Sequence, residues 1–345
     1  PGSPGAVGGD LTVATFNVLN YFTTLDNAGP ICGPDANQGC RGADTAEEFT
    51  RQKTKIVSAI ADIDADVVGL MEIENDAADV AVEDLVDGLN SATAPGTYAN
   101  IVTGPVGPDA IRVALIYKPA SVTPYGAHAV LAGAFLDPNE LGDDKNRAAL
   151  AQSFVDNANG GVFTVAVNHL KSKGSECGAG DDDPEQGSCN VTRTLAAEML
   201  ADWLQTDPTS SGDADFLIIG DLNSYDKEDP INALAGRGYT DLVLRDVGEY
   251  AYSYVVSGQW GYLDYIMANG AAAAQVTGTT VWHINADEPD ILDYDMTFKK
   301  PAQQALYEPN AFRSSDHDPV IVGLELTVTP MQAKDHAIGT LSALL

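Results

Sequence analysis

Short apolar runs rich in valine and isoleucine recur along the chain, and turn-forming residues separate them. Runs of this length and composition predict buried or half-buried β-strands. The predicted strands cover residues 11–18, 66–73, 111–117, 147–155, 162–170, 215–225, 251–256, 261–269, 279–284 and 318–326.

Three segments carry apolar residues at helical spacing and predict helices over residues 45–63, 76–90 and 191–205. At the start of the first of these, Thr45 precedes Glu48 by three positions, which is a capping-box pattern. The predicted strands outnumber the predicted helices by more than two to one. This ratio favours two sheets covered by helices over a single doubly wound parallel sheet.

The 345 residues contain no linker-like stretch, internal repeat or heptad run. We therefore expect one domain over residues 11–327, preceded by a flexible extension (1–10) and followed by a tail (328–345). No apolar stretch approaches the roughly 20 residues that a membrane-spanning helix requires, so we expect no membrane span.

The four cysteines form two close pairs in irregular, Gly- and Asp-rich segments: Cys32 with Cys40, and Cys177 with Cys189. Their spacing is not that of a structural zinc site. Two local disulfides are the better interpretation, and they indicate an oxidising compartment. Four free thiols are the alternative.

Acidic, amide and imidazole residues stand at the ends of several of the apolar runs. Strand ends that meet on one rim can hold a reactive centre rigidly. Carboxylates, amides and imidazoles without cysteine suit a hard divalent cation and in-line attack on phosphorus. The residues concerned are Asn17, Glu72, His169, Asp221, Asn223, Asp264, Asp316 and His317.

In this order, the motifs N…E…NH…GDxN…LDYI…SDHDPV resemble those of the endonuclease/exonuclease/phosphatase superfamily, the deoxyribonuclease I-like metal-dependent phosphodiesterases. Within that superfamily the chain is most similar to the ExeM-like secreted bacterial nucleases, over about residues 11–326. Each motif alone is weak, but the ordered set is specific. The resemblance implies an α/β (α+β) fold, a four-layer sandwich of two packed mixed β-sheets flanked by helices.

The resemblance also implies a role for the acidic and amide residues. Asn17, Glu72 and Asp316 would hold Mg²⁺ or Mn²⁺, since hard cations prefer oxygen ligands. Asp221 would orient or deprotonate the attacking water, and Asn223 would hold the scissile phosphate. An extended segment would place Asp221 and Asn223 on one face, because side chains two positions apart point the same way.

The two imidazoles receive different roles from the resemblance. His317 would contact the phosphate and stabilise the pentacoordinate state, with Asp264 fixing its tautomer. His169 would transfer a proton at the leaving oxygen, and the sequence does not identify a carboxylate partner for it. The histidines without an assigned role are His128, His283 and His336.

Several cations near the motifs are candidates for contact with substrate phosphates. Lys171 and Lys173 alternate just after His169, so both side chains can face the cleft. Arg147 and Arg112 are further candidates. Surface ion pairing is the alternative for each of them in so acidic a chain.

The formal net charge is −32, with only 18 lysines and arginines. A polyanionic substrate is repelled by such a chain unless its cations gather in one groove. Salt screens this repulsion, which predicts a marine or halophilic source; simple solubility of an acidic secreted protein is the alternative. The three aspartates at 181–183 predict either a structural Ca²⁺ site or a solvated acidic loop.

The motifs and the resemblance together predict a secreted, monomeric, metal-dependent endonuclease that cleaves DNA and also RNA. We expect little sequence preference, because phosphate contacts carry no sequence information. A lipid or inositol-phosphate phosphoesterase of the same superfamily is the alternative, although YLDYI replaces the Cys-Asp-Arg signature of the inositol phosphatases, and no apolar hairpin for membrane contact is visible. A non-catalytic adhesion protein is a further alternative, which predicts nucleic-acid binding without turnover.

Overall fold

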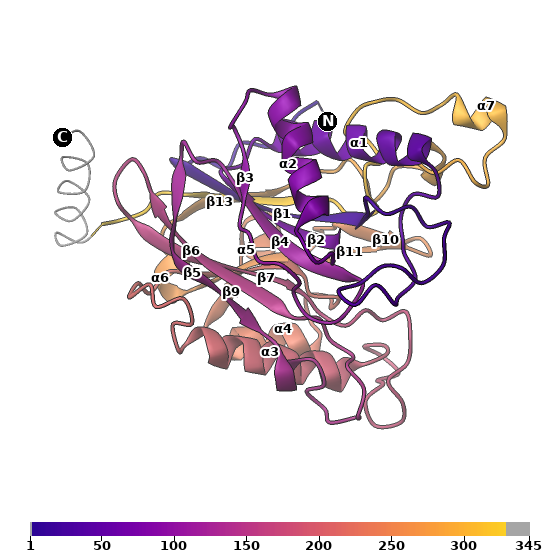
Figure 1. Ribbon diagram of the computed structural model, residues 1–345. Coiled ribbons are helices and arrows are strands. Elements are labelled where there is room, and N and C mark those ends of the chain that lie inside the picture. Colours follow the sequence, from indigo (N-terminus) through magenta and orange to yellow (C-terminus); the bar gives the residue numbers. More distant parts are fainter. Residues whose placement is uncertain (1, 329–345) are drawn as a thin grey trace.

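The computed structural model describes residues 2–328 and contains two six-stranded β-sheets packed face to face (Figure 1). The first sheet has the strand order β13-β14-β1-β2-β4-β3, and the second has the order β5-β6-β7-β8-β12-β9. The central pair of each sheet, β1–β2 or β7–β8, is parallel. The other pairs are antiparallel, so both sheets are mixed.

The strands have the following bounds. The first sheet contains β1 (Leu11–Tyr21), β2 (Val67–Glu74), β3 (Ala99–Asn100), β4 (Ile111–Tyr117), β13 (Val276–Val281) and β14 (Val320–Leu324). The second contains β5 (Val122–Leu131), β6 (Ala149–Asp156), β7 (Val162–His169), β8 (Phe216–Asp221), β9 (Tyr239–Asp241) and β12 (Asp264–Asn269). A separate hairpin pairs β10 (Tyr254–Val256) with β11 (Gln259–Gly261).

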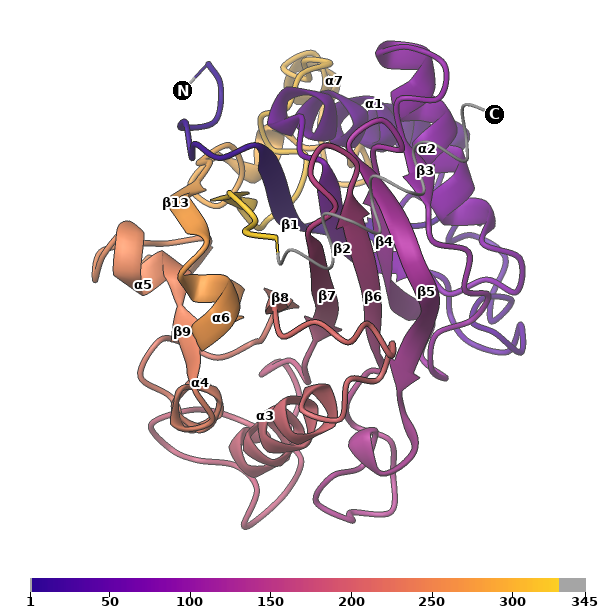
Figure 2. The same ribbon diagram turned by 90° about the vertical axis from the view of Figure 1, so that its left-hand side faces the viewer.

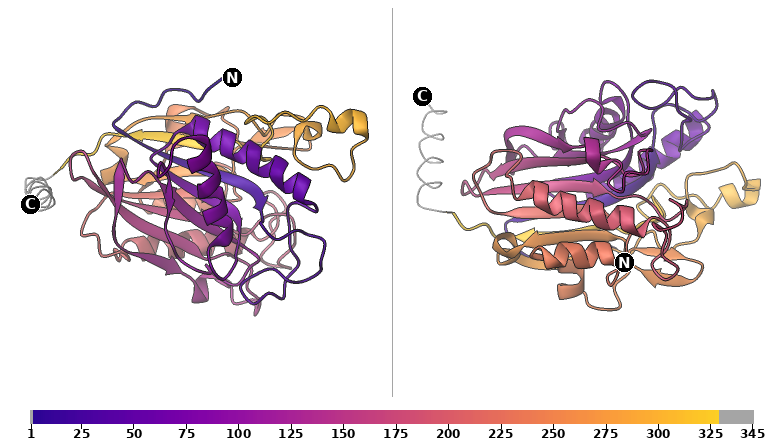
Figure 3. Two further views of the ribbon diagram at one scale, coloured as in Figure 1. Left: turned by 45° about the horizontal axis from the view of Figure 1, so that its top comes forward. Right: turned by 90° about the horizontal axis from the view of Figure 1, so that it is seen from below.

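Helices cover the outer faces of both sheets, which gives four layers (Figure 2). α1 and α2 lie over the first sheet, and α3 and α4 lie over the second (Figure 3). The helices are α1 (Ala46–Ile63), α2 (Val80–Ala92), α3 (Asn190–Leu204), α4 (Asp229–Gly236), α5 (Leu242–Asp246), α6 (Gly270–Ala273) and α7 (Pro301–Gln304), with short 3-10 helices η1 (Gly133–Phe135) and η2 (Asp290–Leu292).

The two sheets approach each other closely at the centre of the sandwich. A Cβ atom on Gly69 of β2 would lie 2.5 Å from Ile219 Cδ1 and 2.9 Å from Val167 Cγ2 of the opposite sheet. Strands β1 and β2 contact β7 and β8 across this interface. Residues at the ends of these four strands therefore come together from both sheets.

The predicted fold class is confirmed, and each predicted strand overlaps an observed one. The capping box between Thr45 and Glu48 is also present. The apolar pattern misses β5, because Pro124 and Gly126 interrupt it and because an edge strand leaves many side chains in water. The second helix begins at Val80, later than its pattern predicts.

Both predicted disulfides form, one between Cys32 and Cys40 and the other between Cys177 and Cys189. Each closes a local loop, as the spacing of the cysteines predicts. The described residues hold no free cysteine, since all four are paired.

The acidic loop at residues 181–183 does not gather its carboxylates around one point. Asp181, Asp182 and Asp183 each accept hydrogen bonds from backbone N–H groups of the loop or of α3. The calcium alternative at these residues is therefore not supported, because their oxygens stabilise the backbone instead.

The predicted N-terminal extension packs against the first sheet at Val7. Val7, within the predicted flexible extension, is buried and its carbonyl accepts a hydrogen bond from Thr277 Oγ1 at 2.8 Å. The predicted tail lies outside the described residues except for Val328. Within residues 2–328, none of the helices has the length and hydrophobicity needed to cross a membrane.

Candidate active site

A pocket of about 500 Å³ opens where β2, β7 and β8 end. It collects most of the residues that the sequence motifs single out. Those residues are Glu72, His169, Asp221, Asn223, Asp316 and His317. The wall also includes Arg41, Arg147, Lys173, Tyr225 and Tyr254. Because chemistry-bearing groups from distant segments converge here, this pocket is the candidate active site.

Asp221, the last residue of β8, lies between the two imidazoles. Its Oδ2 is 3.5 Å from His169 Nε2 and 3.8 Å from His317 Nε2. The same oxygen accepts a hydrogen bond from Asn17 Nδ2 at 3.3 Å. Burial raises the pKa of Asp221 to about 7, against the opposing charge of His317 and with a further rise from Asp264. Such a carboxylate can accept a proton near neutral pH.

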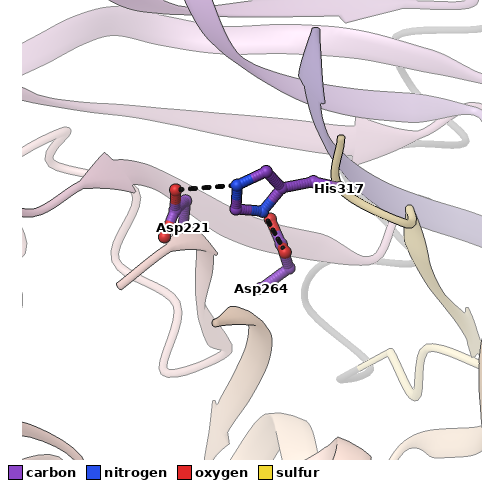
Figure 4. Close-up of side chains that lie close together, drawn as sticks. All are labelled: Asp221, Asp264 and His317. Carbon is purple, nitrogen blue, oxygen red and sulfur yellow. Dashed lines mark hydrogen bonds and ion pairs between the residues drawn. The ribbon is translucent and has the colours of Figure 1, made fainter. Parts of the chain in front are cut away.

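His317 is held by Asp264, the first residue of β12 (Figure 4). His317 Nδ1 is 2.7 Å from Asp264 Oδ2, and that oxygen also accepts a hydrogen bond from the Ser253 hydroxyl at 2.6 Å. Burial opposes a charged imidazole, but nearby carboxylates, that of Asp264 foremost, outweigh it and raise the pKa of His317 well above its ordinary value. These carboxylates therefore favour the protonated form of the imidazole.

His169 is the last residue of β7 and lies on the other side of Asp221. Its surroundings favour the neutral imidazole. Burial and the positive charge of Arg147 lower the pKa of His169 well below its ordinary value. Its Nδ1 has no hydrogen-bond partner within residues 2–328, so no carboxylate there fixes its tautomer. One carboxylate thus lies between a neutral and a charged imidazole, which is an arrangement suited to dividing acid and base roles.

Glu72 lies at a bulge in β2, where the register with β4 shifts. Its φ of 66° falls in the left-handed region that side chains rarely adopt. Glu72 Oε1 accepts a hydrogen bond from Asn17 Nδ2 at 3.2 Å, and Oε2 accepts one from Asn20 N at 3.0 Å. Backbone strain kept at a carboxylate in a pocket points to a functional role for that residue.

The acidic residues fit a hard divalent cation at Glu72 and Asp316. Both residues line the pocket. Burial raises the pKa of Glu72, and the negative charge of Asp316 raises it further. A divalent cation between them would relieve this repulsion. Asn17 Oδ1 accepts a hydrogen bond from Leu19 N at 3.1 Å, so its amide nitrogen faces the carboxylates. The expected metal contact of Asn17 stays a prediction.

A second acidic group is also close enough to surround a cation. Asp221, Asp264 and His317 each offer one ligand atom, and these atoms lie within 4.8 Å of one another. However, the hydrogen bond between Asp264 and His317 already occupies two of the groups, as Figure 4 shows. The geometry therefore favours a carboxylate–imidazole dyad at this position.

The sequence profile of the endonuclease/exonuclease/phosphatase family matches residues 14–317. The chain belongs to this family. Endonuclease/exonuclease/phosphatase proteins hydrolyse phosphoester bonds, generally with divalent metals, and include nucleases, phosphatases and phosphodiesterases. A sequence search among curated proteins gave no match.

Several solved structures have a similar fold. A family protein from Bacteroides thetaiotaomicron matches with a TM-score of 0.59 and 16% identity, over 92% of this chain and 98% of that one. The mannosyl-6-phosphatase of the same bacterium matches with a TM-score of 0.56 and 17% identity, over 91% and 99%. D. rerio TDP2 in complex with a single-strand DNA product matches with a TM-score of 0.51 and 13% identity, over 90% and 97%. At these identities the likeness concerns the fold alone.

Two of the four predicted phosphate-binding cations line the pocket of this family member, namely Arg147 and Lys173. The prediction for Arg112 is wrong. Its guanidinium is buried and pairs with Asp79 at 2.6 Å, so a substrate phosphate cannot reach it. The side chain of Arg112, on β4, lies below the surface. Through Asp79, the N-cap residue of α2, it stabilises the start of that helix.

Lys171 lies next to residues of the pocket wall in the sequence but does not itself line the pocket. Its ammonium donates hydrogen bonds to the Ser172 carbonyl at 2.7 Å and to Ser175 Oγ at 3.0 Å. Burial and the charge of Arg147 lower the pKa of Lys171 to about 8. These contacts support the loop after β7, and a phosphate contact by Lys171 stays a prediction.

Arg41 is a pocket residue that the sequence motifs do not single out. Asp109 accepts a hydrogen bond from Arg41 Nη2 at 3.2 Å and another from Arg147 Nε at 2.8 Å. One carboxylate thus holds two guanidinium groups beside the pocket. The position of Arg41 directly after Cys40 is the available signal, because the disulfide anchors that loop.

Asp221 and Asn223 do not share a face through strand alternation, contrary to the expectation from an extended segment. Asn223 has a φ of 49°, and its N–H donates to Asp221 Oδ1 at 2.9 Å. Asn223 Nδ2 donates to the Leu170 carbonyl at 3.0 Å. A tight turn therefore brings both side chains to the pocket and ties β8 to β7.

The β10–β11 hairpin forms one wall of the pocket, and it corrects a further expectation. The ring of Tyr254 stacks on that of His317 with 4.6 Å between centroids. Trp260, in the opposite strand, is 58% exposed. An exposed apolar hairpin therefore exists. The predicted strand over residues 251–256 covers β10, but the three residues of β11 are too few for a periodic pattern to reveal that β10 pairs in a hairpin.

Proposed function

We propose that this protein is a secreted, divalent-metal-dependent endonuclease that hydrolyses DNA and RNA with little sequence preference. The observation that carries the proposal is the convergence, in one pocket, of Glu72, Asp221 and Asp316 with the imidazoles of His169 and His317. A protein of similar fold, D. rerio TDP2, has been solved with a single-strand DNA product, so a nucleic-acid substrate is compatible with this fold.

Glu72 and Asp316 would hold Mg²⁺ or Mn²⁺. Such a cation would supply a positioned water and neutralisation of charge on the phosphate. The rest of the chemistry belongs to the side chains around it. Asn17 keeps both Glu72 and Asp221 oriented through its amide nitrogen.

Asp221 accepts the proton of the attacking water, because its pKa of about 7 suits proton transfer near neutral pH. We assign His169, whose Nε2 is 3.5 Å from Asp221 Oδ2, the transfer of a proton to the leaving oxygen. Its lowered pKa makes the protonated imidazole a strong acid, and Asp221 returns the proton taken from water to the imidazole after the transfer. Protonated His317 stabilises the negative charge of the pentacoordinate phosphate. We assign Asn223, which lines the same pocket, a contact with this phosphate.

Cations at the rim do not by themselves offset the net charge of −32. Arg41, Arg147 and Lys173 line the pocket, but so do three carboxylates. Arg41 and Arg147 also pair with Asp109, and Lys173 pairs with Glu228. Salt screens the long-range repulsion, so activity should rise with moderate salt, as in a protein from a saline habitat. Two disulfides support secretion into an oxidising medium.

The decisive test is nicking of supercoiled plasmid with Mg²⁺ or Mn²⁺, against EDTA and against the His169→Ala variant. His128→Ala is the matched control, because this histidine lies on edge strand β5 and does not line the pocket. The proposal is supported if the wild type and His128→Ala nick the plasmid with metal, and if nicking is lost in EDTA and in His169→Ala. Plasmid left intact under every metal and salt condition rejects it.

A phospholipid or sugar-phosphate phosphoesterase is the second candidate. The exposed Trp260 on the hairpin favours membrane contact, and a mannosyl-6-phosphatase shares the fold. Release of phosphorylated headgroups from liposomes, or of phosphate from sugar phosphates, without plasmid nicking would favour this candidate.

A salt titration from zero to 1 M tests the argument that salt screens the repulsion between the acidic protein and its substrate. A monotonic loss of activity with rising salt contradicts that argument.

A further inference from the structure

A second pocket, of about 480 Å³, adjoins the candidate active site. The two pockets share Tyr254 and Asp316 in their walls. A ligand in one therefore lies next to a ligand in the other. Pockets of this size accommodate small organic groups, within the range of about 300–1,000 Å³ that binding sites occupy.

The β10–β11 hairpin is the partition between the pockets. Side chains alternate between the faces of a strand. Val255 and Val256 follow that rule, while Tyr254 lines both pockets. Val256 lines the active-site pocket, whereas Val255 and its cross-strand partner Trp260 line the second pocket. The tight turn at Ser257 and Gly258, both with positive φ, sets this register.

Trp260 is exposed but held in place by an aromatic stack. The rings of Trp260 and Tyr252 form a T-shaped pair with 4.6 Å between centroids, and Tyr252 stacks on His283 at 3.8 Å. His283 Nδ1 is 2.9 Å from Asp318 Oδ2, which is fully buried. An indole that is 58% exposed and yet supported in this way is a preorganised stacking surface.

The charge of the second pocket decides what can occupy it. Arg313, its one lining cation, is already paired with Asp290. Asp287 and Glu288 also line it and add negative charge. A phosphate is disfavoured there, while a neutral planar group with N–H donors is favoured, because carboxylates accept hydrogen bonds.

We propose that this second pocket binds the nucleobase next to the scissile phosphate, by stacking on Trp260. The proposal rests on the proposed nuclease function and names the part of the substrate that the neighbouring pocket takes. It implies that single-stranded or locally opened nucleic acid is the form that engages the pocket, since a paired base is not free to stack.

The test uses single-stranded oligonucleotides with one cleavable linkage, flanked by a normal nucleotide or by an abasic residue on either side. Trp260→Ala should lower kcat/KM on the normal substrate by about tenfold. Trp260→Phe should retain most of the activity, because a phenyl ring still stacks. On the substrate that lacks the base at the stacked position, the loss of kcat/KM caused by Trp260→Ala should be smaller than on the normal substrate.

Phe298→Ala is the matched control, because Phe298 is 91% exposed and lines neither pocket. Binding is read separately as quenching of indole fluorescence by the same oligonucleotides in EDTA, and Trp260→Phe should lose that quenching. An equal deficit on normal and abasic substrates, or no deficit and no quenching, would overturn the proposal. Quenching without cleavage by the wild type would instead reject the nuclease function and keep the base-binding pocket.

Discussion

Replacing Asp221 by asparagine should change how the stability of the metal-free protein depends on pH. The pKa of this carboxyl group is raised from 3.8 to about 7, first by burial. A group whose pKa is raised in the folded state stabilises the fold below its unfolded pKa. That contribution is lost as the pH rises through the folded pKa. In EDTA, the wild type should therefore become less stable between pH 3.8 and 7.

The size of the effect follows from the pKa difference. At about 1.36 kcal/mol per pH unit, a rise from 3.8 to about 7 corresponds to up to ~4 kcal/mol of unfolding free energy. Neighbouring carboxylates share part of this amount, because Asp264 and Glu72 both contribute to the raised pKa. Asp221→Asn has no charge to bury, so its stability should fall less over the same interval.

Urea denaturation followed by circular dichroism at pH 4, 5.5 and 7 in EDTA measures the difference. Asp87→Asn is the matched control, because Asp87 is exposed on α2 and should keep the wild-type slope. Excess Mg²⁺ should stabilise the wild type increasingly as the pH rises, since the cation needs ionised carboxylates. Equal slopes for the wild type and Asp221→Asn in EDTA would refute the reasoning.

Three further substitutions test other parts of the site. Asp264→Asn should lower kcat for oligonucleotide cleavage about 10–100-fold with little change in KM, because Asp264 positions His317; a change in KM alone would contradict this role. Glu72→Gln should remove the Mg²⁺-dependent gain in thermal stability and lower kcat/KM by more than about 100-fold, so a variant that Mg²⁺ still stabilises would place the metal elsewhere. Arg112→Met should reduce the unfolding free energy in urea by about 3–5 kcal/mol, because it leaves Asp79 buried without its partner; weakened DNA binding in a fully stable variant would restore Arg112 as a phosphate contact.

The candidate site illustrates where sequence reasoning succeeds. Glu72, His169 and Asp221 each end a strong apolar run, so the pattern that predicts the strand also predicts an edge position for the side chain. The pocket gathers all three. The capping box at the start of α1 is equally local, because its partners are three residues apart.

The cations show where such reasoning fails. Arg112 and Arg147 both lie near motifs in the sequence, yet one is buried against Asp79 and the other lines the pocket. Arg41 reaches the pocket because a disulfide loop and Asp109 hold it there. Which carboxylate a guanidinium meets depends on which segments become neighbours, and no local pattern contains that information.

The sequence by itself determined the class of fold, the two disulfides and the main candidate residues, because hydrophobic periodicity and motif order are properties of the chain. Only the tertiary structure decided the charge states of the imidazoles and the place of the hairpin. His169 and His317 are the same residue type, but burial beside Arg147 lowers one pKa while Asp264 raises the other. Desolvation and electrostatic interactions depend on distances between atoms, and packing of the two sheets sets those distances.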